Sequence, residues 1–203
     1  FVQTINLIYA MEELLSYLNQ VATSAGWPLS PECLDRLREI IRPLTLKKDE
    51  MLLTAGEVCT NIYFIRKGLL KCYYILHEKD ITDWLFAEWD TVVSVDSYYD
   101  QVPGVDFIQA REDCELFYIS FEELEHLYST FVEFNAVGRV LTNKYLRAWH
   151  GMARITRMQR AKERYESFLE RHGEMVNRAS MKDLASLLDM APETLSRMRR
   201  LIN

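Results

Sequence analysis

Side chains that suit nucleic acid gather in the last 24 residues of the chain, Ser180 to Asn203. Asp183 lies three residues after Ser180, which is a helix-capping pattern, and Pro192 can open a second helix after a short turn. Two short helices about a tight turn predict a helix-turn-helix, and a helical hairpin with a solvated basic end is the alternative. Arginine can bond a guanine edge, glutamate can accept from cytosine, and hydroxyls and lysine can contact phosphates. The predicted DNA-contacting residues are Ser180, Lys182, Glu193, Thr194, Ser196, Arg197, Arg199 and Arg200.

Upstream of this segment, apolar residues repeat with heptad spacing, which is typical of a helix that packs against a partner helix. Arg139, Lys144, Arg147 and Arg154 leave the other faces of this helix polar. We therefore expect a two-fold homodimer through residues 134–155, and the alternative is a helix that lies on the rest of its own chain. The expected dimer seam consists of Phe134, Gly138, Leu141, Tyr145, Ala148, Met152 and Ile155.

The elements that must position these segments change character along the chain. Residues 4–25 show helical spacing, and Ser30 can cap a second helix. Short β-rich runs separated by turn residues, with no helix between them, follow over about 44–120 and favour an antiparallel roll or barrel. A capping box at Ser120 and Glu123 then starts a helical pattern that continues to the end. The expected strands are Glu50–Leu53, Ile62–Ile65, Leu69–Leu76, Ile81–Phe86, Thr91–Val95, Phe107–Ala110 and Leu116–Ile119.

Composition excludes several classes of protein. The chain has 203 residues, 49% of them hydrophobic, which is the mixture of a globular protein. No apolar run approaches the ~18 residues of a membrane span, so we expect no membrane partner. The cysteines are too far apart for a zinc knuckle or a redox pair, so we expect free thiols, a cytoplasmic location and no metal site. These cysteines are Cys33, Cys59, Cys72 and Cys114.

The net charge of −6 hides an asymmetry between the two parts of the chain. Residues 1–130 carry 10 basic and 22 acidic side chains, a net charge of −12. Residues 131–203 carry 14 basic and 8 acidic side chains, a net charge of +6. An acidic body with a basic tail is typical of a sensor joined to an anion-binding module.

Several segments of the sequence resemble a known protein family. The stretch AGEVCTNIYFIRKGLLKCYY, in which Gly56 and Gly68 flank a strand, is similar to the β-roll signature of the Crp/Fnr family of bacterial transcription regulators. The segment LASLLDMAPETLSRMRR resembles the DNA-binding helices of that family. The tail from Ala161 to Arg200 is especially similar to Crp/Fnr proteins of Bacteroidetes. The resemblance covers roughly Leu44 to Arg200.

The resemblance implies an α+β fold in which an antiparallel β-roll (a double-stranded β-helix or jelly roll) acts as sensor domain. The expected domains are 1–130 with the N-terminal helices and the roll, 131–156 as a long dimerisation helix, and 157–203 as a small helix-turn-helix domain. The implied function is sequence-specific transcription regulation rather than catalysis. The implied partners are double-stranded DNA with palindromic promoter sites, a second copy of the chain and RNA polymerase.

Cyclic-nucleotide binders of this family share a phosphate-binding cassette, with a Gly-Glu pair followed by Arg-Ser or Arg-Thr. When Cys114–Ser120 is aligned with the strand after the cassette, the Gly-Glu positions hold Val93 and Ser94, and the Arg-Ser positions hold Gly104 and Val105. A buried anion without a counter-cation costs several kcal/mol. We therefore expect no cyclic AMP binding of the usual kind and no cofactor, and the sequence names no other effector.

Other ligands of the family find little support in the residues. The adenine-contacting positions on the long helix hold Trp149 and His150, which are bulky enough to fill the pocket. An iron–sulfur cluster needs several closely spaced cysteines, but only Cys33 precedes the roll. A haem needs an axial ligand, and His77 alone does not indicate a haem site. The aromatic residues near the roll favour either ordinary core packing or an apolar effector site. The candidate effector-pocket residues are Tyr63, Ile65, Val93, Ser94, Gly104, Val105, Tyr145, Trp149 and His150.

Two other functions compete with DNA-dependent regulation. One is a ligand-sensing or protein-interaction module with a degenerate DNA reader, which the acidic body and Pro192 support. The other is a cupin-like roll enzyme, which needs clustered metal ligands. Its histidines would have to be His77, His126, His150 and His172, which are scattered.

Overall fold

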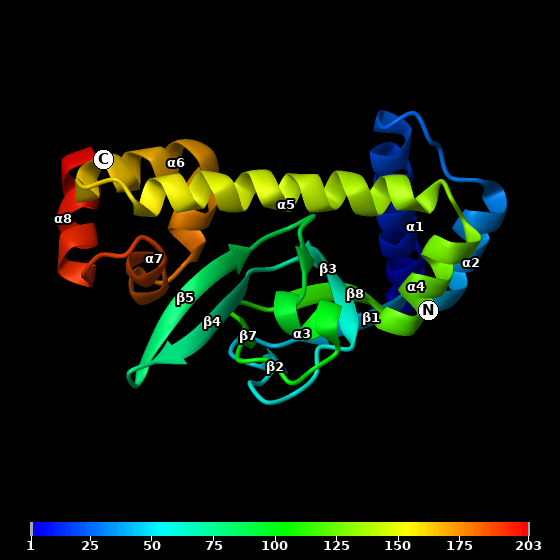
Figure 1. The fold of residues 1–203 in the computed structure, drawn as a ribbon, viewed down its shortest axis with the longest axis horizontal. Coiled ribbons are helices and arrows are strands. Elements are labelled where there is room, and N and C mark those ends of the chain that lie inside the picture. Colours follow the sequence, from blue (N-terminus) through cyan, green and yellow to red (C-terminus); the bar gives the residue numbers. More distant parts are fainter. Residues whose placement is uncertain (1, 203) are drawn as a thin grey trace.

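The computed structural model describes residues 2–202, whose helices and strands are arranged along one long helix. The helices are α1 (Val2–Ser24), α2 (Pro31–Ile40), α3 (Val95–Asp100), α4 (Phe121–Thr130), α5 (Phe134–Thr156), α6 (Ala161–Arg178), α7 (Met181–Leu187) and α8 (Pro192–Ile202). Figure 1 shows α5 lying along the long axis of the molecule, with α1, α2 and α4 at one end and α6, α7 and α8 at the other. None of the helices in residues 2–202 is long and apolar enough to cross a membrane.

The strands form two four-stranded antiparallel sheets beside α5. The first sheet has the order β1-β8-β3-β6, and the second has the order β2-β7-β4-β5. The strands are β1 (Arg42–Leu46), β2 (Met51–Leu53), β3 (Asn61–Lys67), β4 (Leu70–Leu76), β5 (Lys79–Phe86), β6 (Thr91–Val92), β7 (Phe107–Ala110) and β8 (Cys114–Ser120). The expected α+β fold with an antiparallel roll is therefore confirmed.

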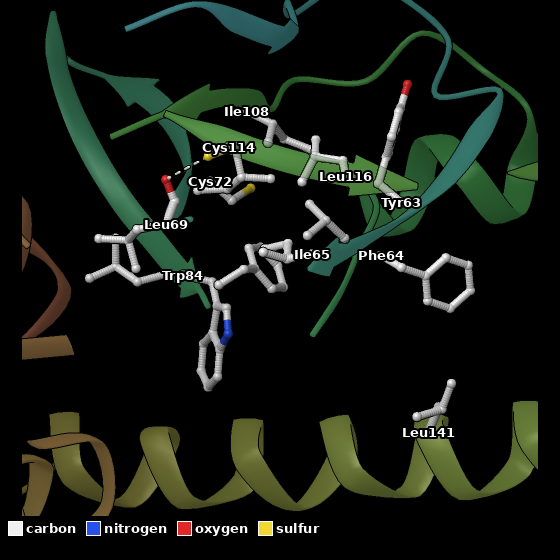
Figure 2. Close-up of a cluster of buried hydrophobic side chains, with 14 of the residues drawn as sticks. Tyr63, Phe64, Ile65, Leu69, Cys72, Trp84, Ile108, Cys114, Leu116 and Leu141 are labelled. Carbon is white, nitrogen blue, oxygen red and sulfur yellow. Dashed lines mark hydrogen bonds between the residues drawn. The ribbon is translucent and has the colours of Figure 1, made fainter. Parts of the chain in front are cut away.

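The interior of the roll is filled by side chains from both sheets (Figure 2). Ile65 and Leu116 come from the first sheet, and Ile108 comes from the second; all three are buried. Cys72 and Cys114 lie in the same cluster, and the thiol of Cys114 donates to the carbonyl of Leu69. All four cysteines are free and buried. Burial raises the pKa of the Cys72 thiol, so it remains protonated and acts as a small apolar side chain.

Two elements, β1 and α3, are not predicted by the sequence pattern, and both differences have a physical reason. β1 contains Pro43, a residue that usually ends a helix or interrupts a strand. β1 lies at the edge of its sheet, however, where a strand tolerates proline. α3 begins where the last residue of the expected strand Thr91–Val95 was placed, so the expectation of no helix within the roll is wrong. α3 is too short to show helical periodicity, and the hydroxyl of its N-cap residue Ser94 donates to Asp106 instead of capping the helix.

The two capping patterns outside the C-terminal segment are confirmed. The hydroxyl of Ser30 accepts the backbone N–H of Cys33 at the start of α2. The hydroxyl of Ser120 accepts the backbone N–H of Glu123 and donates to its carboxylate at 2.8 Å. Arg42 in β1 adds a bidentate ion pair to the same carboxylate, with distances of 2.7 and 2.9 Å. This pair joins the first strand of the roll to the helix that leaves it.

The ion pair between Arg42 and Glu123 predicts a pH dependence of stability. Hydrogen bonding to Arg42 lowers the pKa of Glu123 from 4.5 to about 2. The pair therefore stabilises the folded state fully above the unfolded pKa, and this contribution is lost as the pH falls toward 2. We expect Glu123→Gln to lower the free energy of unfolding by about 1–2 kcal/mol at pH 7, a value discounted for the solvent beside the pair. Urea unfolding at several pH values measures this difference.

The difference between wild type and Glu123→Gln should shrink as the solution is acidified. Glu122→Gln, an exposed neighbour in the same helical turn, serves as the matched control and should leave stability unchanged. A difference that stays constant down to pH 3 would show that the ion pair does not cause it.

Candidate nucleic-acid interface

The C-terminal segment folds as two short helices about a tight turn, as the sequence predicts. The hydroxyl of Ser180 accepts the N–H of Asp183 at 3.0 Å and thereby caps α7. Asp189 adopts a positive φ of 50° in the turn, and α8 begins at Pro192. Leu184 of α7 and Leu195 of α8 are fully buried. The two helices therefore share an apolar contact that fixes the direction of α8.

The outer face of α8 carries the side chains that could reach DNA. Glu193, Arg197 and Arg200 are exposed, and Thr194 and Ser196 are half-buried. Within residues 2–202, neither Arg197 nor Arg200 forms an ion pair, so both guanidinium groups face solvent. Glu193 lies in the first turn of α8, and Arg197 lies one turn further along the same face. This face presents two cations and one carboxylate to solvent.

Three of the predicted DNA-contacting residues have polar partners within the chain. Arg199 donates to the carbonyl of Val176 in α6 and lies against the sulfur of Met181, so its guanidinium does not extend with the other two. Lys182 forms an ion pair with Asp80 at 3.1 Å. The hydroxyl of Ser180 donates to the carboxylate of Asp183 at 2.7 Å. Ser180 and Lys182 remain exposed, so the DNA contacts predicted for them and for Arg199 stay predictions.

The helical pattern of the sequence predicts one helix over about Arg157–Arg171, whereas residues 157–160 lie outside α6, which spans Ala161–Arg178. Arg164 donates to the carbonyl of Met158 at 2.6 Å and to the carbonyl of Asp189 at 3.1 Å. These bonds bring the segment before α6 next to the turn before α8. Arg157 and Arg160 in this segment are exposed. The presence of two arginines within these four positions was the signal that could have drawn attention to the segment.

The expected dimer seam is buried within its own chain. Phe134, Leu141, Met152 and Ile155 are between 1% and 8% exposed, so their side chains cannot contact a partner helix. A Cβ at Gly138 would come within 2.5 Å of the Tyr128 hydroxyl in α4, which shows how closely α4 and α5 approach each other. Heptad spacing shows that a helix has an apolar stripe but not which surface covers it. The structure realises the alternative, in which this stripe of α5 lies on its own chain.

Tyr145 and Ala148, the remaining seam residues, are half-buried against the core. The hydroxyl of Tyr145 accepts the N–H of Thr91 in β6 and donates to the carbonyl of Thr91 at 2.7 Å. Its ring lies 6.4 Å from that of Phe86 in β5, measured between ring centroids. Burial raises the pKa of Tyr145, so the phenol remains a hydrogen-bond donor at neutral pH. Tyr145 thus fastens the middle of α5 to both sheets of the roll.

A different face of α5 is free in the single chain. Its exposed side chains follow alternating spacings of three and four residues, and two of them are large and apolar. Leu146 is 67% exposed and Trp149 is 48% exposed. We call this face the outer strip of α5, and it consists of Arg139, Thr142, Leu146, Trp149 and Ala153.

The candidate effector-pocket residues do not form one site. Tyr63 and Ile65 belong to the roll core, whereas Val105 is 72% exposed and His150 is exposed with Trp149. The remaining candidates pack against their neighbours, since a Cβ at Gly104 would come within 2.9 Å of Ser97 and 3.0 Å of Ser94. The single chain therefore does not bring these candidates together, because Trp149 and His150 are exposed whereas Tyr145 is bonded to the roll.

Two small cavities lie at the borders of the roll. One is lined by Tyr17 of α1, Phe64 of β3 and Trp89, and the other lies between Trp84 of β5 and His172 of α6. Each has a volume of about 10 Å³, which is room for about one water molecule. Among the described residues, no group of three or more His, Cys, Asp or Glu side chains is arranged to hold a metal ion.

Solved structures of bacterial regulators share this arrangement of elements. FixK2 from Bradyrhizobium japonicum matches with a TM-score of 0.69 and 18% identity, over 80% of this chain and 84% of that chain. The c-di-GMP-responsive regulator CLP of Xanthomonas campestris gives 0.65 and 17%, over 85% and 91%. A putative Crp/Fnr-family regulator from Eubacterium rectale gives 0.65 and 16%, over 85% and 83%. No protein-family model and no curated protein sequence matches the chain. The chain therefore has the fold of Crp/Fnr-type transcription regulators.

Proposed function

We propose that the chain is a Crp/Fnr-type transcription regulator that binds palindromic DNA as a homodimer. The observation that carries this proposal is the free outer face of α8, where Glu193, Arg197 and Arg200 are exposed at the end of a helix-turn-helix. The resemblance of the tail to Bacteroidetes members of the family supports the same proposal. RNA polymerase is the further partner that this role requires.

The distribution of charge supports binding by α8 alone. Residues 1–130 carry a net charge of −12, so the roll and its helices repel the phosphate backbone. Residues 131–203 carry +6, and Arg157 and Arg160 lie in the segment that contacts the turn before α8. A polyanion is therefore directed to the C-terminal end of the molecule.

The N-terminal end of α8 enters the major groove in this proposal. Arg197 bonds a guanine edge, and Glu193 accepts from a nearby cytosine. Arg200 contacts a phosphate, and the hydroxyls of Thr194 and Ser196 add further phosphate contacts. Ala191 cannot cap the helix and Pro192 has no backbone N–H, so the start of α8 donates one phosphate contact fewer than a helix capped by serine or threonine.

The outer strip of α5 is the surface that a second copy covers. Burying an exposed leucine or tryptophan side chain contributes roughly 1.5–3 kcal/mol, and heptad spacing allows two copies of the strip to pack as a two-stranded coil. With α5 at the dyad, the two α8 helices face half-sites about one helical turn apart, roughly 34–36 Å.

The roll is proposed to act without a cyclic nucleotide of the usual kind. The expected phosphate-binding positions hold Gly104 and Val105, and Gly104 packs directly against Ser94 and Ser97. Asp106 follows closely and hydrogen-bonds to Ser94, so this part of the roll carries a carboxylate where a phosphate would need a cation.

Calorimetry with cyclic AMP tests this part of the proposal. At millimolar cyclic AMP we expect no saturable heat, because no guanidinium neutralises the phosphate. Binding with micromolar affinity would show that the phosphate site lies elsewhere in the roll.

Substitutions on α8 test the DNA contacts. We expect Arg197→Ala to weaken binding to a selected palindrome by about 1–3 kcal/mol and to relax preference at one base pair per half-site. Arg200→Ala should weaken all sequences alike and reduce the salt slope by about one. Fluorescence anisotropy with competitor DNA at several salt concentrations measures both effects.

Arg199→Ala is the control on the same helix, because this guanidinium is half-buried and donates to the carbonyl of Val176. It should lower thermal stability and leave base preference unchanged. If Arg197→Ala binds as tightly and as selectively as wild type, α8 does not read DNA in this way.

Light scattering tests the dimer surface. The double substitution Leu146→Asp with Trp149→Asp should give folded monomers, because both side chains are exposed in the single chain. Leu141→Asp should instead unfold the protein, since its side chain is 8% exposed within the same chain. If the double variant is still a dimer, the outer strip is not the dimer surface.

A further inference from the structure

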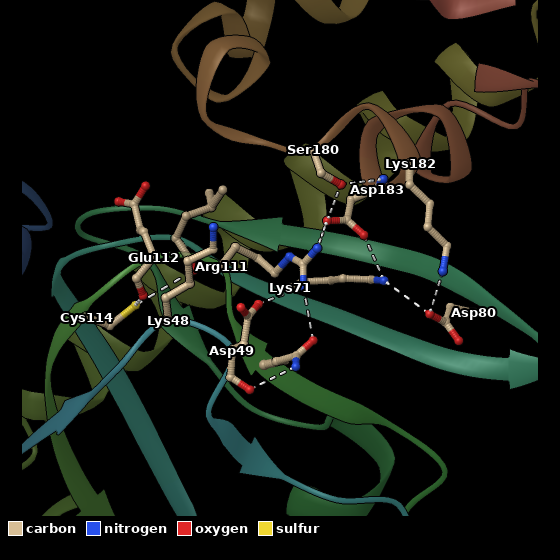
Figure 3. A network of polar contacts seen from close by, with 12 residues as sticks. Lys48, Asp49, Lys71, Asp80, Arg111, Glu112, Cys114, Ser180, Lys182 and Asp183 are labelled. Carbon is tan, nitrogen blue, oxygen red and sulfur yellow. Dashed lines mark hydrogen bonds and ion pairs between the residues drawn. The ribbon is translucent and has the colours of Figure 1, made fainter. Parts of the chain in front are cut away.

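A buried group of charges joins the roll to the helix-turn-helix (Figure 3). Asp183, in the first turn of α7, is 1% exposed, and Lys71 of β4 is 2% exposed. Lys71 pairs with one oxygen of Asp183 at 2.9 Å, and Arg111 pairs with the other at 2.6 Å. The two carboxylate oxygens therefore bind cations from two different segments of the roll. We call the group of Lys71, Arg111 and Asp183 the interdomain triad.

Further contacts surround the triad on the same side of the roll. The backbone N–H of Thr82 in β5 donates to the hydroxyl of Ser186 in α7 at 2.9 Å. Arg178, at the end of α6, forms a bidentate pair with Glu88 at 2.7 and 2.9 Å. Arg178 also pairs with Glu112, the residue after Arg111. The helix-turn-helix is thus held by its first helix and by the end of α6.

The energetics of buried ion pairs suggest that the triad fixes the orientation of α7 on the roll more than it adds to the stability of the fold. A buried ion pair can often be replaced by apolar residues without loss of stability, but removing one partner leaves an unpaired buried charge. Burial alone would raise the pKa of Asp183, but hydrogen bonds from Lys71 and Ser180, with the charge of Arg111, lower it. Asp183 is therefore ionised, and in the docked position of α7 each of its two oxygens lies beside a cation of the roll. Moving α7 away would leave this buried carboxylate without its counter-charges.

The triad leaves the outer face of α8 free. Its contacts come from α7 and the end of α6, whereas Glu193, Arg197 and Arg200 remain exposed. Further contacts on this side are the ion pair of Lys182 with Asp80 and the ring of Trp84 beside that of His172. The segment 157–160, which joins α5 to α6, has no regular helix. The triad can therefore set the direction of α8 without covering it.

We propose that Lys71 and Arg111 are positioning residues for DNA binding, which hold α7 so that the α8 helices of a dimer meet two half-sites at once. This inference rests on the proposed function. Two linked readers gain roughly 10²–10⁴ in affinity over one reader, and the gain is lost when their geometry is wrong. The triad therefore matters for a complete palindrome and not for a single half-site.

The test compares Lys71→Met with Lys67→Met, an exposed lysine of the same roll that serves as the matched control. Affinity is measured for a selected palindrome and for the same duplex with one half-site scrambled. We expect Lys71→Met to bind the palindrome roughly tenfold or more weakly, to bind the half-site as wild type does, and to tolerate altered half-site spacing. Lys67→Met should behave as wild type on both duplexes.

Arg111→Gln is the second variant, because it leaves Lys71 paired with Asp183 and folds if Lys71→Met does not. It should shift the ratio of palindrome to half-site affinity in the same direction by a smaller factor. An unchanged ratio in the folded variants, or tighter binding to the palindrome, would overturn the proposal.

Hydrogen exchange at the Thr82 amide gives a readout that needs no DNA. This N–H is bonded across the interface to Ser186, so its protection reports whether α7 is docked. We expect protection in wild type and faster exchange in Lys71→Met, and equal protection in both would overturn the proposal. If wild type binds no palindrome but its Thr82 amide responds in this way, the proposed function fails while the docking by the triad stands.

Discussion

One apolar stripe on α5 holds the whole chain together. At its start, Phe134 is buried, and its ring lies 5.4 Å from that of Tyr128 in α4, measured between centroids. In its middle, Tyr145 is bonded to the backbone of β6. Near its end, Met152 lines a small cavity with Trp84 of β5, Phe168 of α6 and Leu187 of α7. A single helix therefore connects the N-terminal helices, the roll and the C-terminal helices, and any dimer must use a face that this stripe leaves free.

The sequence allowed much of this to be predicted where local rules decide the structure. Capping serines, turn residues and short β-rich runs gave the helix-turn-helix and the roll, because these patterns depend on a few neighbouring residues. Long-range contacts decided the rest. Arg199 and Arg197 are both cations on one helix, but Arg199 is half-buried against Val176 and Met181, whereas Arg197 is exposed. The stripe on α5 was visible as spacing, but the identity of the surface that covers it depends on the complete fold.

The charged side chains of the roll and of the C-terminal part have different roles. The acidic roll uses its few cations internally, with Arg42 on Glu123 and with Lys71 and Arg111 on Asp183. The C-terminal part keeps Arg197 and Arg200 in solvent. Structural neighbours below 20% identity share the fold, so the fold alone leaves function open. The proposed function therefore depends on where these few charges point.

The pairing of the strands has a consequence for the order of assembly during synthesis. β1 pairs with β8, and Arg42 lies opposite Tyr118. The first strand of the roll can therefore join its sheet only after the last strand has been synthesised. Contacts this distant in sequence close slowly, because the intervening chain must first lose its conformational freedom. Asp183 can find Lys71 and Arg111 only after that closure. The helix-turn-helix, although built from local contacts, follows the roll in sequence and thus docks onto a roll that has already formed.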